Sequence, residues 1–357
     1  MKKYSILMGI LLLAMFSIFY QQEASQKDQG QLTSMNEENS NILLPIKAIE
    51  KETHFLLDDF INLVGGTYDY NSVHRTLDLR VNGDKFYFVD GVPVVQKNGE
   101  YLVTDAVKMT INEQEHIYLP VSFIEVALGS PVTSQENTIS FLHQEEAKQV
   151  ASYVHSIDIE NWDVEKMVEY LAFLEKPIKG AEVSKIPSHL PGAPRAYRNG
   201  FHEGIDWYDF ASGGGISTNT PVYAMGEGVV VRADQQYEEY ASSEDRNQDL
   251  TYTAAIGETP EFIFDRLRGR QVWVQYEGGV MNRFAHLHAI PENIQVGTKV
   301  DSETVIGYVG NSGTSDAVEQ NYNAGLHLHQ DLLIYGELFW KYLSQEEVLE
   351  VLERIWE

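Results

Sequence analysis

Three short segments in the C-terminal half of the chain hold histidines at spacings that suit metal chemistry. Five of the 11 histidines lie in "FHEGIDW", "FAHLHAI" and "GLHLHQ", as His202, His286, His288, His327 and His329. Residues i and i+2 of a strand face the same side, so His327 and His329 can share one site. Gly204 argues against a helix in the first segment. We therefore expect His202 and Asp206 on a loop or strand edge, where imidazole and carboxylate converge.

Two histidines and one carboxylate form a hydrolytic zinc set that leaves a fourth position for water. The pair "HLH" alone would not indicate a metal, and it is the added His202/Asp206 pair that favours one. Zinc bound in this way lowers the pKa of water to about 7 and polarises the carbonyl under attack. Further histidines in the same pocket would serve the proton transfers and the developing oxyanion.

The elements that must position these residues are predicted to be strands. From about Ala181 to Gly336 the chain consists of short apolar or alternating runs separated by glycine-containing turns: "PVYAMGEGVVVRA", "RQVWVQYEGG", "NRFAHLHAI", "TVIGYVGNSG" and "GLHLHQDLLIY". This pattern predicts an all-β domain. The end of the chain, "GELFWKYLSQEEVLEVLERIWE", has apolar residues at helical spacing, which predicts a closing amphipathic helix.

Several of these motifs, in this order, resemble the lysostaphin/LytM-type zinc endopeptidases of bacterial cell walls. The resemblance covers about Arg198 to Ile334 and includes "HEGID", the "TPVYAMGEGVVVRA" strands, "FAHL", "VGTKVDSETVIGYVGNSGTS" and "GLHLH". It implies a catalytic domain of the duplicated hybrid motif type, made of antiparallel sheets. It also implies one zinc ion as cofactor and peptidoglycan peptides as substrate.

Carried over position by position, the resemblance implies a role for five residues. The zinc ligands fall on His202, Asp206 and His329, and the two catalytic histidines on His286 and His327. The catalytic pair would orient or deprotonate the attacking water and stabilise the tetrahedral intermediate. His288 matches no functional position, and we expect it to be a surface or packing residue.

The chain departs from the family pattern in three places. After "HLH", Gln330 stands where the family usually has an aromatic residue, ahead of the acid Asp331, and Phe284 stands where Tyr is common. A longer, acidic and Tyr-rich insertion runs from about Gln235 to Gly269. Three roles are open for this insertion: a lid over the groove, a binding site for a partner, or a solvated loop.

The segments upstream predict an exported protein with a spacer. Lys2 and Lys3 precede an apolar run, so residues 1–20 read as a signal anchor, or as a signal peptide if they are cleaved. Residues 21–41 form a flexible polar linker and residues 144–180 a helical one. Between them, residues 42–143 predict a small α+β domain that resembles the stalk domain named after the N-terminal domain of copper amine oxidases. The expected zinc endopeptidase domain spans residues 181–357.

Composition excludes several classes of function. Without cysteine the chain has no thiolate catalysis, disulfides or zinc fingers. The formal net charge of -27 at pH 7 excludes nucleic acid as a favoured partner, because a polyanion is repelled.

The sequence thus predicts a zinc metalloendopeptidase that hydrolyses peptide bonds in peptidoglycan stems or cross-bridges. It would act outside the cytoplasm, anchored to the bacterial cell membrane, or secreted if the signal is cleaved. The alternative is a dormant or regulated envelope scaffold of the same fold, with a protein partner at the stalk domain or the 235–269 insertion. A module for metal storage or sensing would not explain the ordered motifs.

Overall fold

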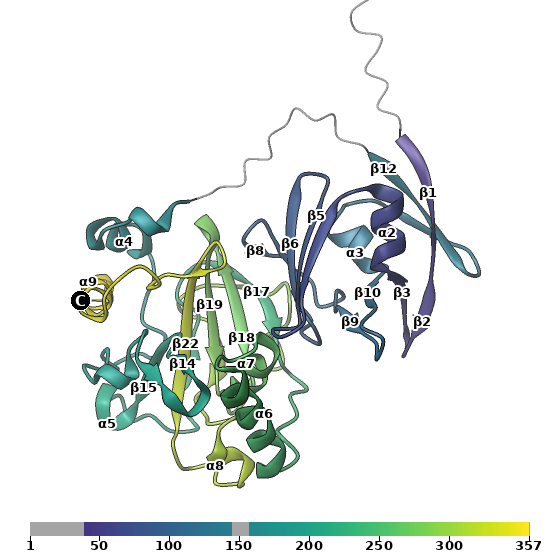
Figure 1. Ribbon diagram of the computed structural model, residues 1–357. Coiled ribbons are helices and arrows are strands. Elements are labelled where there is room, and N and C mark those ends of the chain that lie inside the picture. The colour runs from purple at the N-terminus through teal and green to yellow at the C-terminus, as the bar shows by residue number, and fades with distance from the viewer. Residues whose placement is uncertain (1–38, 145–156, 357) are drawn as a thin grey trace, which may run out of the picture.

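The computed structural model describes residues 39–144 and 157–356, which form two packed parts (Figure 1). The predicted membrane segment and most of the polar linker lie outside the described residues. Within the described residues, no helix has both the length and the apolarity needed to span a bilayer.

The N-terminal part is an α+β unit with three antiparallel sheets. The rings of Phe55, Phe60 and Phe123 pack against one another in its core, in tilted and edge-on arrangements. At the Asn82-Gly83 turn both residues have positive φ, 54° and 80°, as a two-residue hairpin loop of this sequence type requires. The strands are β1 (Asn39–Pro45), β2 (Lys47–Ile49), β3 (Glu52–Leu56), β4 (Thr67–Asn71), β5 (Thr76–Val81), β6 (Asp84–Val89), β7 (Gln96–Lys97), β8 (Glu100–Tyr101), β9 (Thr110–Ile111), β10 (Ile117–Pro120), β11 (Val132–Ser134) and β12 (Thr138–Gln144); the helices are α2 (Leu57–Val64) and α3 (Ser122–Val126).

The C-terminal part is built on one seven-stranded antiparallel sheet with the order β15-β22-β19-β18-β17-β20, and β23 pairs with β22. Its strands are β13 (Pro194–Arg195), β14 (Gly200–Phe201), β15 (Ile205–Tyr208), β16 (Pro221–Tyr223), β17 (Gly228–Ala233), β18 (Val272–Tyr276), β19 (Val280–Ala285), β20 (Lys299–Val300), β21 (Val305–Tyr308), β22 (His327–Ile334) and β23 (Glu337–Leu338). The prediction of a mainly β domain of antiparallel sheets behind a small α+β domain is confirmed.

Helices surround this sheet. They are α4 (Val164–Leu171), α5 (Asp209–Ser212), α6 (Ser243–Ile256), α7 (Glu261–Leu267), α8 (Ser315–Val318) and α9 (Gln345–Trp356). Figure 1 shows α9 beside α4, and α6, α7 and α8 grouped at one end of the sheet. The closing helix α9 lies where its apolar spacing predicts, and Trp356 donates a hydrogen bond to the Leu174 carbonyl.

The two faces of the sheet differ in what covers them. On β22 the even-numbered residues from Leu328 to Ile334 are buried, and Leu328, Leu332 and Ile334 belong to the main core. Leu333, on the other face, belongs to a smaller hydrophobic cluster that also contains Tyr101 of the N-terminal part. The Tyr101 backbone N–H donates to Gln275 Oε1, 3.1 Å away, and its ring packs edge-on against Trp273. Because side chains alternate along a strand, the face that carries Leu333 also carries the odd-numbered residues of β22. The N-terminal part therefore covers one end of the face on which the histidines stand.

Candidate active site

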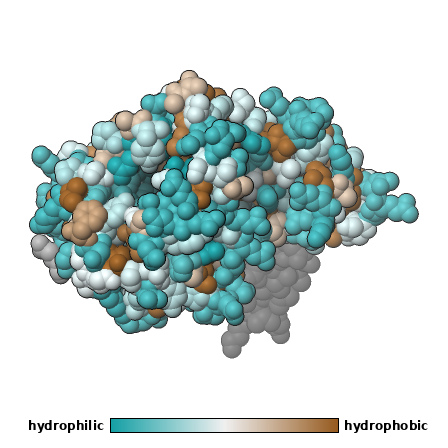
Figure 2. Space-filling view, turned by 90° about the horizontal axis from the view of Figure 1, so that it is seen from below, coloured by the Kyte–Doolittle hydropathy of each residue, from teal (hydrophilic) through white to brown (hydrophobic). Residues whose placement is uncertain are grey.

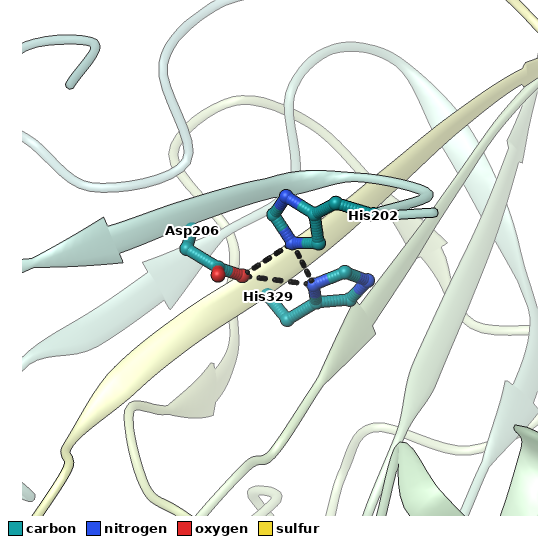
Figure 3. Close-up of side chains that lie close together, drawn as sticks. All are labelled: His202, Asp206 and His329. Carbon is teal, nitrogen blue, oxygen red and sulfur yellow. Dashed lines mark hydrogen bonds and ion pairs between the residues drawn. The ribbon is translucent and has the colours of Figure 1, made fainter. Parts of the chain in front are cut away.

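Three of the predicted site residues bring donor atoms together on this face (Figure 3). His202 Nε2 lies 2.9 Å from Asp206 Oδ1 and 3.1 Å from His329 Nδ1, and Asp206 Oδ1 lies 2.9 Å from His329 Nδ1. All three residues are buried. Donor atoms this close, from two imidazoles and one carboxylate, form a set that one small divalent cation can bridge.

His202 lies in the loop between β14 and β15. Its backbone N–H donates to the Ala193 carbonyl and its own carbonyl accepts from Gly192. Gly204 then lets the chain pass β22, since a Cβ there would lie 2.2 Å from the Gln330 carbonyl oxygen. His202 Nδ1 is 3.0 Å from the Leu190 carbonyl, which can only accept, so Nδ1 carries the proton and Nε2 keeps its lone pair for a metal.

His329 and Asp206 are directly opposite each other in the β15–β22 pair. His329 Nε2 is 2.7 Å from Asp331 Oδ1, which accepts a hydrogen bond from the Nε2–H and so directs Nδ1 toward His202 and Asp206. Burial alone would lower the pKa of His329, but the carboxylates of Asp331 and Asp206 raise it to about 9. Without a metal the imidazole therefore also carries a proton on Nδ1 near pH 7, and a bound cation would displace that proton. Burial likewise works against ionisation of Asp206, yet His202 and the other imidazoles hold its pKa well below the usual value. The carboxylate is therefore ionised, as a metal ligand must be.

The other two predicted residues, His286 and His327, line the same groove. Their ring centroids are 4.7 Å apart. His327 Nδ1 lies 2.8 Å from the Gly325 carbonyl and His286 Nδ1 lies 2.7 Å from the Ser312 carbonyl. Both rings therefore carry their proton on Nδ1 and keep a lone pair on Nε2. Burial is the main cause that lowers the pKa of both, so both are neutral near pH 7.

The structure thus brings together all five residues that the sequence singled out. A comparison with protein families identifies the domain around these residues. Residues 200–338 match the model of peptidase family M23. These residues form an M23 domain. M23 peptidases are zinc-dependent, and the donor set of His202, Asp206 and His329 fits one zinc ion.

Solved structures of similar proteins accompany this match. The catalytic domain of lysostaphin from Staphylococcus simulans is 19% identical, over 47% of this chain and 86% of that one, with a TM-score of 0.26. A zinc-containing peptidase from Vibrio cholerae is 14% identical over 73% and 56%, with a TM-score of 0.30. The SpoIIQ–SpoIIIAH pore-forming complex is 18% identical over 46% and 85%, with a TM-score of 0.28. No curated protein sequence matches the chain. At these levels the structural similarities add nothing to the family match.

A groove of about 750 Å³ passes over the five residues of the M23 domain. The insertion from Gln235 to Gly269 forms one wall through α6 and α7, with Arg246, Leu250 and Phe264 among the lining residues. Arg246 Nε donates to the Gly313 carbonyl, and Glu239 accepts from the Gly313 N–H. Among the three roles left open by the sequence, a solvated loop is wrong, because the insertion is docked beside the site.

Sequence reasoning assigned no role to four residues that contact the site. Tyr208 lies opposite His327 in the strand register and stacks on its ring, with centroids 4.4 Å apart and an interplanar angle of 14°. Arg195 donates to Asp206 Oδ2, 3.2 Å away. Asp331 and Arg268 lie behind His329. Asp331 lies two residues after His329 on β22, and Tyr208 lies two residues after Asp206 on β15, so spacing along a strand was a signal for both. For Arg195 and Arg268 the sequence holds no comparable signal.

Proposed function

We propose that this chain is a zinc metalloendopeptidase that hydrolyses peptide bonds in bacterial peptidoglycan, in stem peptides or cross-bridges. The observation that carries the proposal is the meeting of two groups in one groove. One group is the donor set of His202, Asp206 and His329, and the other is the pair of neutral imidazoles with lone pairs on Nε2. A storage site would need the first group and not the second.

The proposed mechanism divides the work among these residues. His202, Asp206 and His329 would hold a zinc ion, which would supply a Lewis acid for the scissile carbonyl and the attacking water. His327 Nε2, 3.9 Å from Asp206 Oδ1, accepts a proton from the water and returns it to the leaving amine. His286 orients the water by accepting a hydrogen bond at Nε2 from the second O–H of the water. The hydrogen bonds from both Nδ1 atoms to backbone carbonyls fix the rings in the orientation that this requires.

The charge of the groove supports a substrate that carries carboxylates. The groove is lined by Arg195, Arg198, Arg246 and Arg268, in a chain of net charge -27. Three of these arginines are paired with carboxylates: Arg195 with Asp206, Arg198 with Glu203, and Arg268 with Asp331. The positive charge offered to a substrate therefore comes mainly from Arg246 and from a divalent cation in the donor set. Figure 2 shows a mostly hydrophilic surface with hydrophobic residues in small separate groups. Peptidoglycan peptides, which are polar and bear free carboxylates, suit such a groove.

The location proposed for this activity is the outer side of the bacterial cell membrane. It rests on the sequence of residues 1–20, with two lysines before an apolar run, and on the polar stretch that follows. If those residues are cleaved, the same domain is released as a secreted enzyme.

The experiment that tests this function incubates the zinc-loaded full-length chain with purified peptidoglycan and identifies the products by mass spectrometry. New peptide fragments that are absent with a His329→Ala variant would support the enzyme and identify the bond that is cut. Intact peptidoglycan beside a chain that holds one zinc ion would instead favour the alternative, an envelope scaffold of the same fold.

A further inference from the structure

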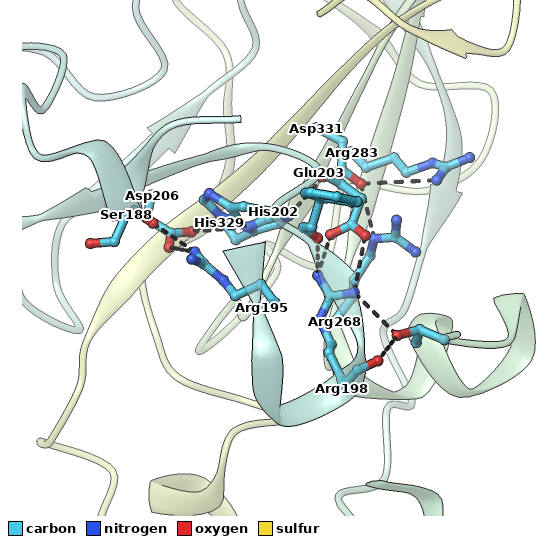
Figure 4. Close-up of polar contacts among 12 residues, drawn as sticks. Ser188, Arg195, Arg198, His202, Glu203, Asp206, Arg268, Arg283, His329 and Asp331 are labelled. Carbon is cyan, nitrogen blue, oxygen red and sulfur yellow. Dashed lines mark hydrogen bonds and ion pairs between the residues drawn. The ribbon is translucent and has the colours of Figure 1, made fainter. Parts of the chain in front are cut away.

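Asp331 is a fully buried carboxylate directly behind the proposed zinc site. Its two oxygens are divided between two tasks: Oδ1 lies 2.7 Å from His329 Nε2, and Oδ2 accepts from Arg268 Nε at 2.9 Å (Figure 4). A buried charge is tolerated only where a partner compensates it and its lone pairs are satisfied. The position of Oδ1 relative to His329 therefore depends on what holds Oδ2.

Arg268 is placed to hold Asp331 Oδ2. Its side chain is only 4% exposed, and its guanidinium stacks on the Phe264 ring, 3.5 Å from the ring centroid. It follows α7 at the end of the 235–269 insertion. Its backbone carbonyl also accepts a hydrogen bond from the His286 N–H at 2.8 Å. Arg268 thus contacts the backbone of His286 and also the carboxylate that is hydrogen-bonded to His329.

The second cation near Asp331 is less well placed. Arg283 Nη1 is 3.9 Å from Asp331 Oδ2, beyond hydrogen-bonding distance. Its Nη2 donates instead to the Tyr101 hydroxyl of the N-terminal part at 2.9 Å, and its guanidinium stacks on Trp273. Arg283 contributes charge to the surroundings of Asp331, but it does not fix the direction of the carboxylate.

We propose that Arg268 is a positioning residue of the metal centre. By holding Asp331 Oδ2 it aims Oδ1 at His329 Nε2, which fixes the imidazole with its Nδ1 toward His202 and Asp206. The 235–269 insertion is therefore a structural part of the zinc site as well as a wall of the groove. This inference rests on the proposed zinc site and not on the proposed substrate.

The test measures zinc affinity of the full-length chain by competition with a chelator, without substrate. Loss of an outer-shell partner of a metal ligand typically lowers metal affinity about 10- to 100-fold, and we expect a loss in this range for Arg268→Gln. Arg268→Lys, which keeps the positive charge, should recover part of it. Arg266→Gln is the matched control: it lies two residues earlier on α7 and also pairs with an aspartate, Asp249, but that pair does not reach the metal centre.

A double-mutant cycle separates positioning from loss of fold. In an Asp331→Asn background the path from Arg268 to His329 is already broken, so Arg268→Gln should lower zinc affinity no further. The visible spectrum of the cobalt-substituted protein gives a second readout, because it reports the environment of the ligands. The proposal is overturned if Arg268→Gln binds zinc as tightly as Arg266→Gln, or if its effect persists undiminished in Asp331→Asn. Because no substrate is present, failure to cleave peptidoglycan would leave this result intact.

Discussion

The chain contains the tripeptide His-Leu-His twice, and the two copies place their imidazoles differently. In the copy at His327 and His329, both imidazoles enter the groove, one in the donor set and one beside it. In the copy at His286 and His288, the first imidazole lines the groove and the second is exposed. The same spacing of the same residues thus gives a pair in one place and a single residue in the other.

Backbone conformation explains the difference. His327 and His329 lie within β22, where alternate residues share a face. Strand β19 ends at Ala285, and His286 has a φ of 58°, in the left-handed region that few residues other than glycine adopt. The chain turns there, so the same-face rule does not extend to His288. Backbone strain of this kind is typical of functional sites, and here the backbone N–H of His286 is bonded to Arg268 and its ring to Ser312.

The largest effect expected within this comparison is at His329. His329→Ala removes one of three ligands and leaves Asp331 without its imidazole partner. Zinc affinity should fall by well over the roughly 100-fold upper range for outer-shell partners, and hydrolysis should fall to background. Metal content after dialysis, measured by mass spectrometry, checks this. A variant that still holds one equivalent of zinc would remove His329 from the ligand set.

The next effect is expected at the two imidazoles beside the donor set. His327→Gln and His286→Gln should each lower turnover about 10²- to 10⁴-fold, the range for a lost general acid or base. Zinc should stay bound, since neither residue belongs to the donor set. Single-turnover rates on a defined peptide, together with metal content, separate this outcome from that of His329→Ala. Turnover close to that of the unchanged chain would contradict the proton-transfer roles.

Local patterns in the sequence were enough to predict two pairs of residues at the site, whereas the place of His286 and the role of each residue came from the family resemblance. The same-face rule placed His327 with His329, and Gly204 indicated the non-helical segment that brings His202 to Asp206. These inferences depend on local backbone geometry, which sequence reports well. The sheet itself followed from short apolar runs between glycine turns.

The remaining parts of the site depend on contacts that sequence spacing does not encode. Arg268, the residue after α7, donates to Asp331 of β22, which is 63 residues away in the sequence, and nothing in the composition of the insertion indicates this. The contact of Tyr101 with Arg283 and Trp273 joins segments more than 170 residues apart. Predicted boundaries for the N-terminal segment, the linkers and the two domains stay predictions, as does the stalk-domain resemblance.

A smaller effect is expected at Tyr208, whose ring stacks on His327 of the tripeptide in β22. Aromatic stacking contributes about 0.5–1.5 kcal/mol, so Tyr208→Ala should lower turnover by up to about tenfold through loss of ring order. Tyr208→Phe keeps the stacked ring and should remain within about twofold of the unchanged chain. Steady-state kinetics of the two variants, with zinc content as control, decide the matter. An equal loss in both would assign the effect to the hydroxyl and not to the stacking.

The smallest effect is expected at His288, which is exposed and is not among the residues that line the groove. Its backbone N–H donates to the Tyr308 carbonyl and its carbonyl accepts from Arg270, and both bonds survive removal of the side chain. Exposed side chains without special contacts usually change the free energy of unfolding by no more than about 0.5 kcal/mol, so His288→Ala should leave stability and turnover within about twofold. Thermal unfolding and steady-state rates, compared with those of His286→Gln, provide the check. A loss as large as that of His286→Gln would mean that the chain does not turn at His286 in solution, and that both imidazoles of this tripeptide face the site.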